Sequence, residues 1–258
     1  MKRVFGLIGY PLTHSFSKSY FNTKFKLEGI DAVYENFPLA GIGEFPALIQ
    51  HKSGLAGLNV TIPYKEVVIP FLDELDKDAA AIAAVNVIEV EHRNGKIRLI
   101  GHNSDYIGFK DSILPEIERL RSANSEELKA LILGTGGASK AVYYALSQLG
   151  IQSCFVSRDA KKARYTYSDL DSERIKSHQI IVNTTPLGMT PNVESYPELP
   201  YQALGPGHLL YDLVYNPSLT RFLYLGKQQG ARTVNGENML ELQAEAAWRI
   251  WNKQSETK

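Results

Sequence analysis

The residues best suited to proton chemistry in the first half of the chain are a lysine and an aspartate, Lys65 and Asp105. Lys65 follows the strand-like run 55–62 and Pro63, a residue that suits the first turn of a helix. In such a turn the helix dipole and partial burial would disfavour the protonated lysine and ease proton exchange near neutral pH. Asp105 could cap the helix that it opens, or pair with Lys65 in a cleft. The ordinary alternative for Lys65 is an exposed lysine without chemistry.

Further polar residues stand where strand-like runs begin or end, which is where open α/β sheets bind their ligands. Asn59 and Thr61 alternate along one face of a strand, and Asn86 begins a hairpin. Ser15 and Ser17 follow the first strand and could hydrogen-bond a carboxylate or a hydroxyl, although serines at such places also cap helices. Together these residues predict a site for a small hydroxylated substrate in the first half.

A glycine-rich turn in the second half predicts a dinucleotide site. The segment 134–138, Gly-Thr-Gly-Gly-Ala, lies between the apolar strand-like run 131–133 and a helical pattern. Glycines in that place let the backbone approach a pyrophosphate, whose charge is stabilised by free N–H groups at the helix N-terminus. The match to G-x-G-x-x-G is incomplete, because Ser139 stands where the third glycine would be. A purely structural turn is the alternative.

The end of the next strand distinguishes NAD from NADP. The run 151–157 is followed by Arg158 and Asp159, and then by Lys161 and Lys162. An arginine there can bind the 2′-phosphate of NADP, whereas an acidic residue accepts hydrogen bonds from the ribose of NAD. Arg158 and the lysines therefore favour NADP, while Asp159 keeps NAD possible. The alternative is a solvated turn with ordinary surface charge.

The elements that would position these residues alternate between strand and helix, which predicts an α/β protein with largely parallel sheets. In the first half we expect strands at 4–10, 33–39 and 55–62, helices at 18–27 and 73–84, and a hairpin of 85–93 and 96–103 around Asn94-Gly95. In the second half we expect helices at 107–121 and 238–251, a linker at 122–125, and strands at 129–133, 151–157, 179–183 and 209–214. Short strands that alternate with helices in this way are typical of a doubly wound, Rossmann-type domain.

Two domains with a cleft between them are therefore expected. Residues 1–105 would form the substrate-binding and catalytic domain, with the last helix (about 238–258) packed back on it. Residues 106–237 would bind NADP. The length of 258 residues accommodates two domains of ordinary size.

The composition narrows the partners to small molecules. Lysine plus arginine equals aspartate plus glutamate, at 28 each, so no global charge attracts nucleic acid or an anionic membrane. The single cysteine, Cys154, excludes an intramolecular disulfide and a multi-cysteine zinc site, and we expect no metal. No apolar run is long enough to span a bilayer. We expect a cytoplasmic protein that is a monomer or a homodimer.

Short motifs follow one another in a definite order: Gly9-x-Pro11-x-x-His14-Ser15-x-Ser17, Asn59-Val60-Thr61-x-Pro63-x-Lys65, Ala84-Val85-Asn86, Gly101-x-Asn103-Ser104-Asp105-x-x-Gly108, Gly134-x-Gly136-Gly137-Ala138, Asn183 to Met189, Tyr211 to Pro217, and Gly236 to Gln243. Their joint order resembles that of the shikimate dehydrogenases along essentially the whole chain. The resemblance implies NADPH-dependent reduction of 3-dehydroshikimate to shikimate, a step towards chorismate and the aromatic amino acids.

The resemblance also implies a role for each matching position. Lys65 and Asp105 would be catalytic. The substrate contacts would be Ser15, Ser17, Asn59, Thr61, Lys65, Asn86, Asp105, Tyr215 and Gln243. The cofactor contacts would be Gly134, Thr135, Gly136, Gly137, Ala138, Ser157, Arg158, Lys162, Thr185, Leu213 and Gly236.

Several positions depart from the family pattern. Phe21 replaces a frequent histidine, Val87 and Ser104 replace threonines, and Glu237-Asn238 interrupts an apolar stretch. The segment between Arg158 and Asn183 is also short. None of these departures removes a proposed catalytic group, and the last two bear on the cofactor contacts more than on the chemistry.

We hypothesise direct hydride transfer from the nicotinamide to the ring ketone. Lys65 would donate a proton or stabilise the developing charge, while Asp105 would hold Lys65 and a substrate hydroxyl in place. Two alternatives remain at this point: a quinate/shikimate dehydrogenase with relaxed substrate or NAD use, and a non-catalytic NADP-binding regulator.

Overall fold

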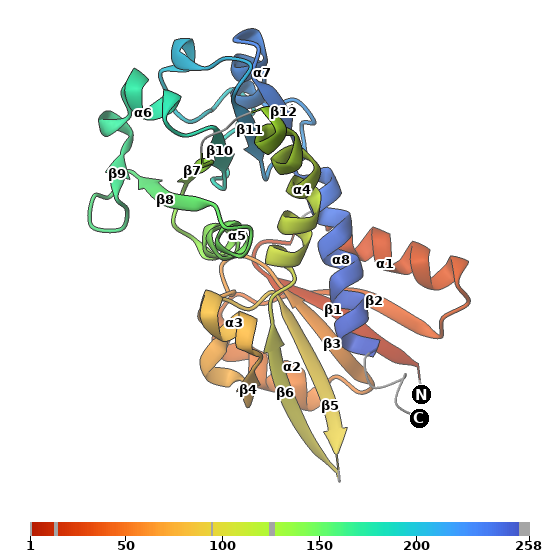
Figure 1. The fold of residues 1–258 in the computed structure, drawn as a ribbon. Coiled ribbons are helices and arrows are strands. Elements are labelled where there is room, and N and C mark those ends of the chain that lie inside the picture. The colour runs from red at the N-terminus through yellow and green to blue at the C-terminus, as the bar shows by residue number, and fades with distance from the viewer. Residues whose placement is uncertain (1, 13–14, 94, 124–126, 253–258) are drawn as a thin grey trace. The chain divides into compact units, whose positions relative to one another are not determined.

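The computed structural model describes residues 2–12, 15–93, 95–123 and 127–252. The chain divides into two compact units (Figure 1). Unit 1 comprises Met1–Ser104 and Ala244–Lys258, and unit 2 comprises Asp105–Gln243. Each unit is a six-stranded sheet with helices, so the expected α/β class is confirmed.

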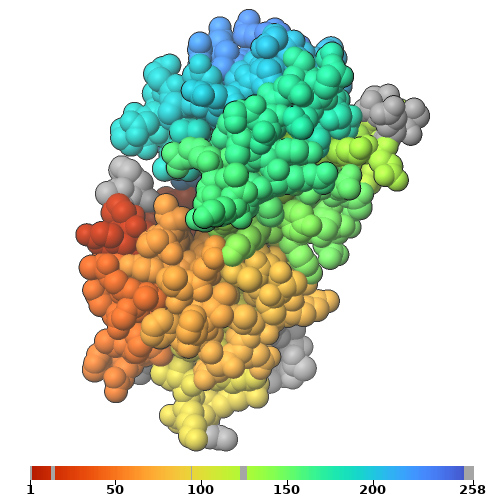
Figure 2. Space-filling view, turned by 90° about the vertical axis from the view of Figure 1, so that its left-hand side faces the viewer, coloured from red at the N-terminus to blue at the C-terminus, as the bar shows by residue number. Residues whose placement is uncertain are grey.

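The sheet of unit 1 is mixed. Its strands are β1 (Arg3–Gly9), β2 (Ala32–Pro38), β3 (Leu55–Val60), β4 (Glu74–Leu75), β5 (Val87–Arg93) and β6 (Lys96–His102), in the order β2-β1-β3-β5-β6-β4. β1 pairs in parallel with β2 and β3, whereas β5 is antiparallel to β3 and β6. The hairpin of β5 and β6 is the predicted one and projects beyond the other strands (yellow in Figures 1 and 2), although Asn94 at its turn lies outside the described residues.

Helices cover both faces of this sheet, because side chains alternate in direction along each strand. Phe5 of β1 packs against Phe25 and Trp251 in an aromatic cluster beneath α1 (Phe16–Leu27) and the end of α8 (Glu237–Asn252). Two other residues of β1, Val4 and Ile8, belong to a second cluster on the opposite face of the sheet. That face is covered by α2 (Phe45–His51) and α3 (Lys77–Ile82), with the short 3-10 helices η1 (Ile42–Glu44) and η2 (Ile69–Phe71).

All strand pairs of the unit 2 sheet are parallel. The strands are β7 (Lys129–Leu133), β8 (Gln152–Ser157), β9 (Tyr165–Thr166), β10 (Ile180–Asn183), β11 (Leu209–Asp212) and β12 (Arg232–Val234), in the order β12-β11-β10-β7-β8-β9. The chain builds outwards from β7 through β8 to β9, and then crosses back to start again at β10. The strand order thus reverses between β7 and β10, as in a doubly wound sheet.

Two clusters of buried side chains fill the space between this sheet and its helices. One face packs against α4 (Asp105–Ala123), α5 (Gly137–Gln148) and the start of α8. The other packs against α6 (Ser172–Lys176) and α7 (Arg221–Gln228), with η3 (Tyr167–Asp169) and η4 (Tyr201–Ala203). No helix in the described part of the chain is long and apolar enough to cross a membrane.

Two helices expected in the first half differ from the prediction: the one expected to begin at Pro63 is absent, and the one expected at 73–84 is shorter. Residues 61–68 form a series of turns before η2, so Lys65 is not in a helix. Pro70, which has no N–H to donate, prevents these turns from continuing as a helix. Of the helix expected at 73–84, only 77–82 is helical, because Asp76 caps it by accepting a hydrogen bond from Ala79 N at 2.6 Å.

Other boundaries also differ from the prediction. α1 begins at Phe16 rather than at residue 18. α4 begins at Asp105 and includes two residues of the expected linker, Ser122 and Ala123, while residues 124 and 125 lie outside the described part. The sequence did not predict α2, β4, β9 or β12.

Candidate active site

In unit 1 the carboxyl ends of β1 and β3 lie side by side and start two of the predicted ligand loops. Thr61 N donates to Ile8 O at 2.9 Å, and Tyr10 N donates to Ile62 O at 3.1 Å. The approach requires glycine at position 9, since a Cβ there would lie 2.4 Å from the Thr61 methyl carbon. The loop that leads to Ser15 and the loop that leads to Lys65 therefore leave the sheet at the same edge.

Ser15 and Ser17 are placed by the start of α1. Ser15 is the N-cap, and its Oγ accepts a hydrogen bond from Lys18 N at 3.1 Å. Capping was the alternative given for these serines, and it holds for Ser15. Ser17 lies in the first turn of the helix, and both serines are partly buried. Thr13 and His14, which precede them in the motif, lie outside the described residues.

A buried tyrosine that the sequence analysis did not single out organises this region. Tyr34 of β2 is fully buried, and its hydroxyl donates to Asn59 Oδ1 at 2.7 Å. Phe21, at the position where the family often has histidine, stacks on the Tyr34 ring with 4.9 Å between centroids. Burial raises the pKa of Tyr34 far above its usual value, while a hydrogen bond with Ser17 lowers it. Tyr34 thus links two proposed substrate residues, Ser17 and Asn59.

The network continues to Asn86 and the end of β6. Asn59 Nδ2 donates to Asn86 O at 3.2 Å. Asn86 Nδ2 donates to Ser104 Oγ at 3.0 Å, and Asn86 Oδ1 accepts from Ser104 N at 2.6 Å. Ser104 therefore keeps the hydroxyl of the threonine that it replaces. Asn59, Asn86 and Ser104 are all buried.

Lys65 is half-buried and its main chain is fixed, since Val85 N donates to Lys65 O at 2.7 Å. Because Lys65 stands in turns rather than in a helix, the predicted influence of a helix dipole on it is wrong. Asp105 is buried in the first turn of α4. Lys65 belongs to unit 1 and Asp105 to unit 2, so their pairing stays a prediction.

A buried histidine lies directly before the Asn103-Ser104-Asp105 segment. His102 Nδ1 is 2.6 Å from Asp76 Oδ2, and its Nε2 is 3.1 Å from Glu89 Oε2. Burial lowers the pKa of His102, but the two carboxylates outweigh it and raise the pKa to about 8. At neutral pH a charged imidazolium therefore holds β6 to β5 and to the start of α3. The sequence offered no signal for this cluster, since its members are far apart in the chain.

In unit 2, Asp105 and Gln243 are carried by two helices in close contact. A Cβ at Gly108 would lie 2.6 Å from Met239 O and 2.8 Å from Gln243 Cβ. Only glycine at position 108 lets the first turns of α4 approach α8 so closely.

The glycine turn of unit 2 stands at the point where the strand order reverses. Leu133 O, at the end of β7, accepts from Thr184 N at 3.0 Å and from Thr184 Oγ1 at 2.6 Å. Gly134 follows with φ of 112°, a left-handed conformation that favours glycine. In open α/β sheets this reversal is where ligands bind.

The start of α5 fits a pyrophosphate. Its N-cap is Gly136, with no side-chain hydrogen bond to the cap and no acidic residue in the first turn. A Cβ at Gly136 would meet no atom within 4 Å, so the turn is open on that side. Ser139, in place of the third glycine, is buried and donates its hydroxyl to Gly136 O at 2.5 Å. The free N–H groups therefore remain available to an anion.

The turn after β8 leaves its basic side chains in solvent. Ser157 Oγ accepts from Asp159 N at 3.1 Å, and Asp159 Oδ1 accepts from Lys161 N at 3.0 Å. Asp159 is thereby engaged in its own turn. Arg158 and Lys162 are exposed and can reach an anion at this strand end.

The remaining proposed cofactor residues gather at the ends of β10 and β11. Thr185 is hydrogen-bonded to Asn183, the last residue of β10. Leu213 follows β11 and touches the segment before α8, because a Cβ at Gly236 would lie 2.2 Å from Leu213 O. Tyr215, a proposed substrate contact that also follows β11, is 41% exposed.

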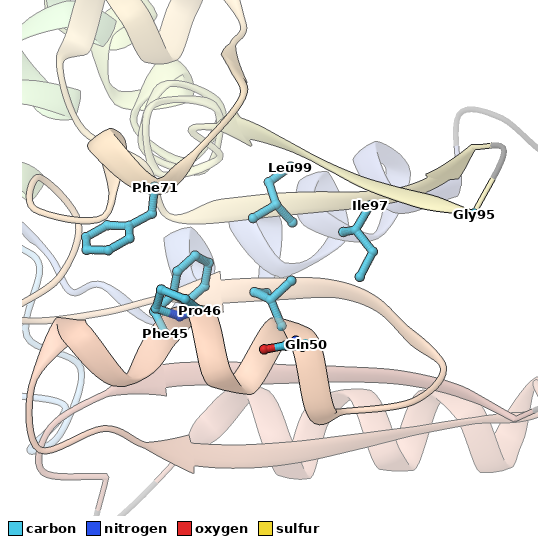
Figure 3. Close-up of a pocket in the computed structure, with 8 residues that line it drawn as sticks. Phe45, Pro46, Gln50, Phe71, Gly95, Ile97 and Leu99 are labelled. Atoms are coloured by element: carbon cyan, nitrogen blue, oxygen red, sulfur yellow. The ribbon is translucent and has the colours of Figure 1, made fainter.

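An apolar pocket of about 410 Å³ lies between α2 and β6 in unit 1 (Figure 3). Its lining includes Phe45, Phe71 and Leu99, and Gln50 is its one polar side chain. A pocket without ionisable groups does not suit the chemistry expected here. Among the described residues, no three His, Cys, Asp or Glu side chains are arranged to hold a metal ion.

Comparison with known proteins identifies relatives across the whole chain. A family model, the substrate binding domain of shikimate dehydrogenase, matches residues 7–88. A protein of Halothermothrix orenii named shikimate dehydrogenase (NADP(+)) is 39% identical over 96% of this chain and 90% of its own.

Two solved structures share the fold of the whole chain. The shikimate 5-dehydrogenase of Thermus thermophilus, in complex with NADP(H) and shikimate, has a TM-score of 0.82 and 27% identity, covering 97% of this chain and 94% of its own. The quinate dehydrogenase of Corynebacterium glutamicum, in complex with NAD, has a TM-score of 0.84 and 26% identity, covering 98% of this chain and 94% of its own.

Proposed function

This chain belongs to the shikimate dehydrogenase family, and we propose how its residues divide the work of its reaction, the NADPH-dependent reduction of 3-dehydroshikimate to shikimate. The chain is an NADP-dependent oxidoreductase of the shikimate pathway, which leads to chorismate and the aromatic amino acids. Its residues must hold the substrate, align its ketone with the reduced nicotinamide, and supply a proton.

The unit 1 network holds the substrate. Ser15 and Ser17, at the start of α1, bind the substrate carboxylate. Asn59, Thr61 and Asn86 bind the ring hydroxyls, and their amides are pre-oriented because Asn59 is fixed by Tyr34 and Asn86 by Ser104. From unit 2, Asp105, Gln243 and Tyr215 complete the substrate contacts.

Lys65 and Asp105 carry the proton chemistry. As the ring ketone becomes an alcohol, its oxygen gains negative charge and requires a proton. Lys65 donates that proton or stabilises the charge, while Asp105 holds the ammonium group and a substrate hydroxyl in position. The fixed main chain at Lys65 O supports this geometry.

The edge of the unit 2 sheet holds NADP. The segment 134–138 binds the pyrophosphate at the open start of α5. Ser157, Arg158 and Lys162 bind the 2′-phosphate, and Thr185, Leu213 and Gly236 contact the rest of the cofactor. When bound, the reduced nicotinamide supplies the hydride.

The observation that carries this proposal is the open glycine turn at the reversal of strand order, in a chain that also retains Lys65 and Asp105. The test is to follow NADPH formation from NADP⁺ and shikimate with the purified protein. Activity is expected with both present and none when either is omitted. A protein that binds NADPH but oxidises no shikimate would instead be a non-catalytic NADP-binding regulator.

A second candidate is a quinate/shikimate dehydrogenase, because the quinate dehydrogenase shares the fold over nearly the whole chain. The ratio of kcat/KM for shikimate and quinate, measured with NADP⁺ and with NAD⁺, separates the two. A ratio near one for the two substrates favours the second candidate.

We also propose that the enzyme works in the cytoplasm on small molecules alone, as a monomer or a homodimer. The single cysteine suits a reducing compartment, and the equal numbers of basic and acidic residues do not favour nucleic acid. Cell fractionation and size-exclusion chromatography test these two points.

A further inference from the structure

A buried carboxylate at the end of β11 ties three segments of unit 2 together. Asp212 has no exposed surface. Its Oδ1 accepts hydrogen bonds from Asn183 Nδ2 at 2.9 Å and from Val214 N at 3.0 Å. Its Oδ2 accepts from Thr220 Oγ1 at 2.5 Å. One side chain thus joins the end of β10, the loop after β11 and the N-cap of α7.

The hydrogen bonds continue from Asn183 into the loop after β10. Asn183 Oδ1 accepts from Thr185 N at 3.1 Å and from Thr185 Oγ1 at 2.6 Å. Thr185 Oγ1 in turn accepts from Leu187 N at 3.3 Å. The amide of Asn183 is therefore fully oriented: its NH₂ group faces Asp212 and its oxygen faces Thr185.

The chemistry of the carboxylate explains why an aspartate stands at this position. The partners Asn183, Val214 and Thr220 are neutral donors, so burial raises the pKa of Asp212 to about 6 although these hydrogen bonds lower it. An anion at such a place costs more than an uncharged side chain would. In return, its two oxygens accept from several donors at once, which one amide oxygen does not replace.

We propose that Asp212 is a positioning residue for the bound cofactor. It holds the loops 184–187 and 213–220 in fixed positions at the edge of the sheet where NADP binds. It does so directly at Val214 and Thr220, and through Asn183 at Thr185. The inference rests on the proposed function in one respect, because it takes Thr185 and Leu213 to be cofactor contacts.

The first test is the Kd for NADPH, measured by the fluorescence of the bound cofactor without substrate. Asp212→Asn keeps the shape of the side chain but places an NH₂ group where Oδ2 accepts from Thr220. We expect the Kd to rise about tenfold at pH 8, the equivalent of one misplaced loop contact of roughly 1.4 kcal/mol. Asn183→Ala, which frees Thr185, should give a similar rise.

A double variant shows whether Asp212 acts on the loop after β11 through its hydrogen bond with Thr220. Asp212→Asn and Thr220→Val both break that bond, so the two changes together should raise the Kd no further than about tenfold. A rise of roughly thirtyfold, the product of a tenfold and a threefold single effect, would mean that the two side chains act independently and would overturn the proposal. Tyr211→Phe is the matched control, since it removes a buried hydroxyl of the same strand that is hydrogen-bonded to Ser112, and its Kd should equal that of the unchanged protein.

A pH profile separates positioning from a general loss of stability. Below pH 6 Asp212 of the unchanged protein takes up a proton and loses an acceptor, whereas the asparagine variant does not titrate. The ratio of the two Kd values should therefore fall from about ten at pH 8 to about three at pH 5. The 2′-phosphate of NADPH titrates equally with both proteins and cancels from the ratio. A ratio that is constant with pH contradicts the proposal.

A second variant covers the case that Asp212→Asn does not fold. Thr220→Val removes one donor to the carboxylate, whereas Thr220→Ser retains it. The valine variant should bind NADPH about threefold more weakly, and the serine variant should bind like the unchanged protein. Equal affinities for all three contradict the positioning role. If the unchanged protein itself does not bind NADPH, the proposed function fails rather than this inference.

Discussion

At the scale of single residues, the side chain proposed to act most directly on the reaction is Lys65. Because its proposed role is to supply a proton or a positive charge to the forming alkoxide, its loss should act on chemistry and not on cofactor binding. Lys65→Ala should lower kcat by about 10²–10⁴-fold, with the Kd for NADPH unchanged. Lys77→Ala, an exposed lysine of unit 1, is the control and should retain full activity. Turnover of Lys65→Ala near that of the unchanged enzyme would remove Lys65 from the mechanism.

Arg158 is the residue that we propose distinguishes NADP from NAD. Its guanidinium is exposed at the end of β8, where the 2′-phosphate of NADP is proposed to bind. Arg158→Gln should raise the KM for NADPH by about tenfold to a hundredfold, while the KM for NADH stays the same. Arg119→Gln, on the exposed side of α4, serves as the control. Equal effects on both cofactors would exclude Arg158 as the reader of the phosphate.

Tyr34 is expected to act on substrate binding through Asn59. Tyr34→Phe removes the donor to Asn59 Oδ1 and leaves a buried amide oxygen unpaired. The KM for shikimate should rise about tenfold while kcat changes less than about threefold. In an Asn59→Ala background the same change should have no further effect on KM. Tyr201→Phe, which loses a buried hydroxyl bond to Pro197 O, should leave KM unchanged.

Some of the site was predictable from residue types and some was not. Asn59, Thr61, Lys65 and Asn86 could be singled out because polar side chains at strand ends are conspicuous against an apolar pattern. Tyr34 could not, because a tyrosine within a strand looks like an ordinary core residue and its partner Asn59 is distant in the chain. Asp212 and Asn183 are ordinary strand-end residues until the sheet brings β10 and β11 together.

At the scale of elements, the periodicity of apolar residues predicted most strands. It failed for the short helices, whose bounds depend on single residues such as prolines. The hairpin of β5 and β6 and the strands of unit 2 were expected because alternation and turn residues agree there. A helix was expected to begin at Pro63, because proline suits a first helical turn, but the residues that follow form turns, and Pro70 has no N–H to extend them as a helix. α2 is a single short helix with a proline in its first turn, too brief for its period to be recognised.

The contact between α4 and α8 gives a prediction at this scale. In an isolated helix Gly108→Ala would stabilise by about 1 kcal/mol, since alanine is the better helix former. Here the added methyl group would lie 2.6 Å from Met239 O, and overpacking against backbone costs roughly 1–3 kcal/mol. The clash therefore dominates and displaces Gln243 from α4.

Gly108→Ala should accordingly lower the melting temperature and raise the KM for shikimate severalfold, about three to ten times. The control is Gly43→Ala, where the new Cβ meets no atom within 4 Å. Thermal unfolding and steady-state kinetics measure both effects. A more stable Gly108→Ala with an unchanged KM would show that helix propensity, and not the close approach, governs this position.

At the scale of the whole molecule, the two units should lose stability in different ranges of pH. In unit 1 the folded pKa of His102 is about 8, above its ordinary value of 6.5. The contribution of His102 to the free energy of unfolding is therefore complete below pH 6.5. As the pH rises through 8 it is lost, which lowers the free energy of unfolding by about 2 kcal/mol. In unit 2 the folded pKa of Asp212 is about 6, above its ordinary value of 3.8. The contribution of Asp212 to the free energy of unfolding is complete below pH 3.8. As the pH rises through 6 it is lost, which lowers the free energy of unfolding by about 3 kcal/mol.

Both tryptophans of the chain, Trp248 and Trp251, belong to unit 1, which allows the two losses to be observed separately. Between pH 6.5 and 8.5 the denaturant midpoint followed by tryptophan fluorescence should fall, and His102→Gln should flatten that slope. Asp212→Asn should leave the fluorescence midpoint unchanged. Circular dichroism follows both units, so the transition of unit 2 is the one without a counterpart in tryptophan fluorescence, and Asp212→Asn should reduce the fall of its midpoint between pH 4 and 6. If His102→Gln leaves the alkaline slope of the fluorescence midpoint intact, the imidazolium between Asp76 and Glu89 is not what holds β6 in place, and the ladder of β5 and β6 with the hydrogen bonds between Asn86 and Ser104 must hold the start of the Asn103-Ser104-Asp105 segment.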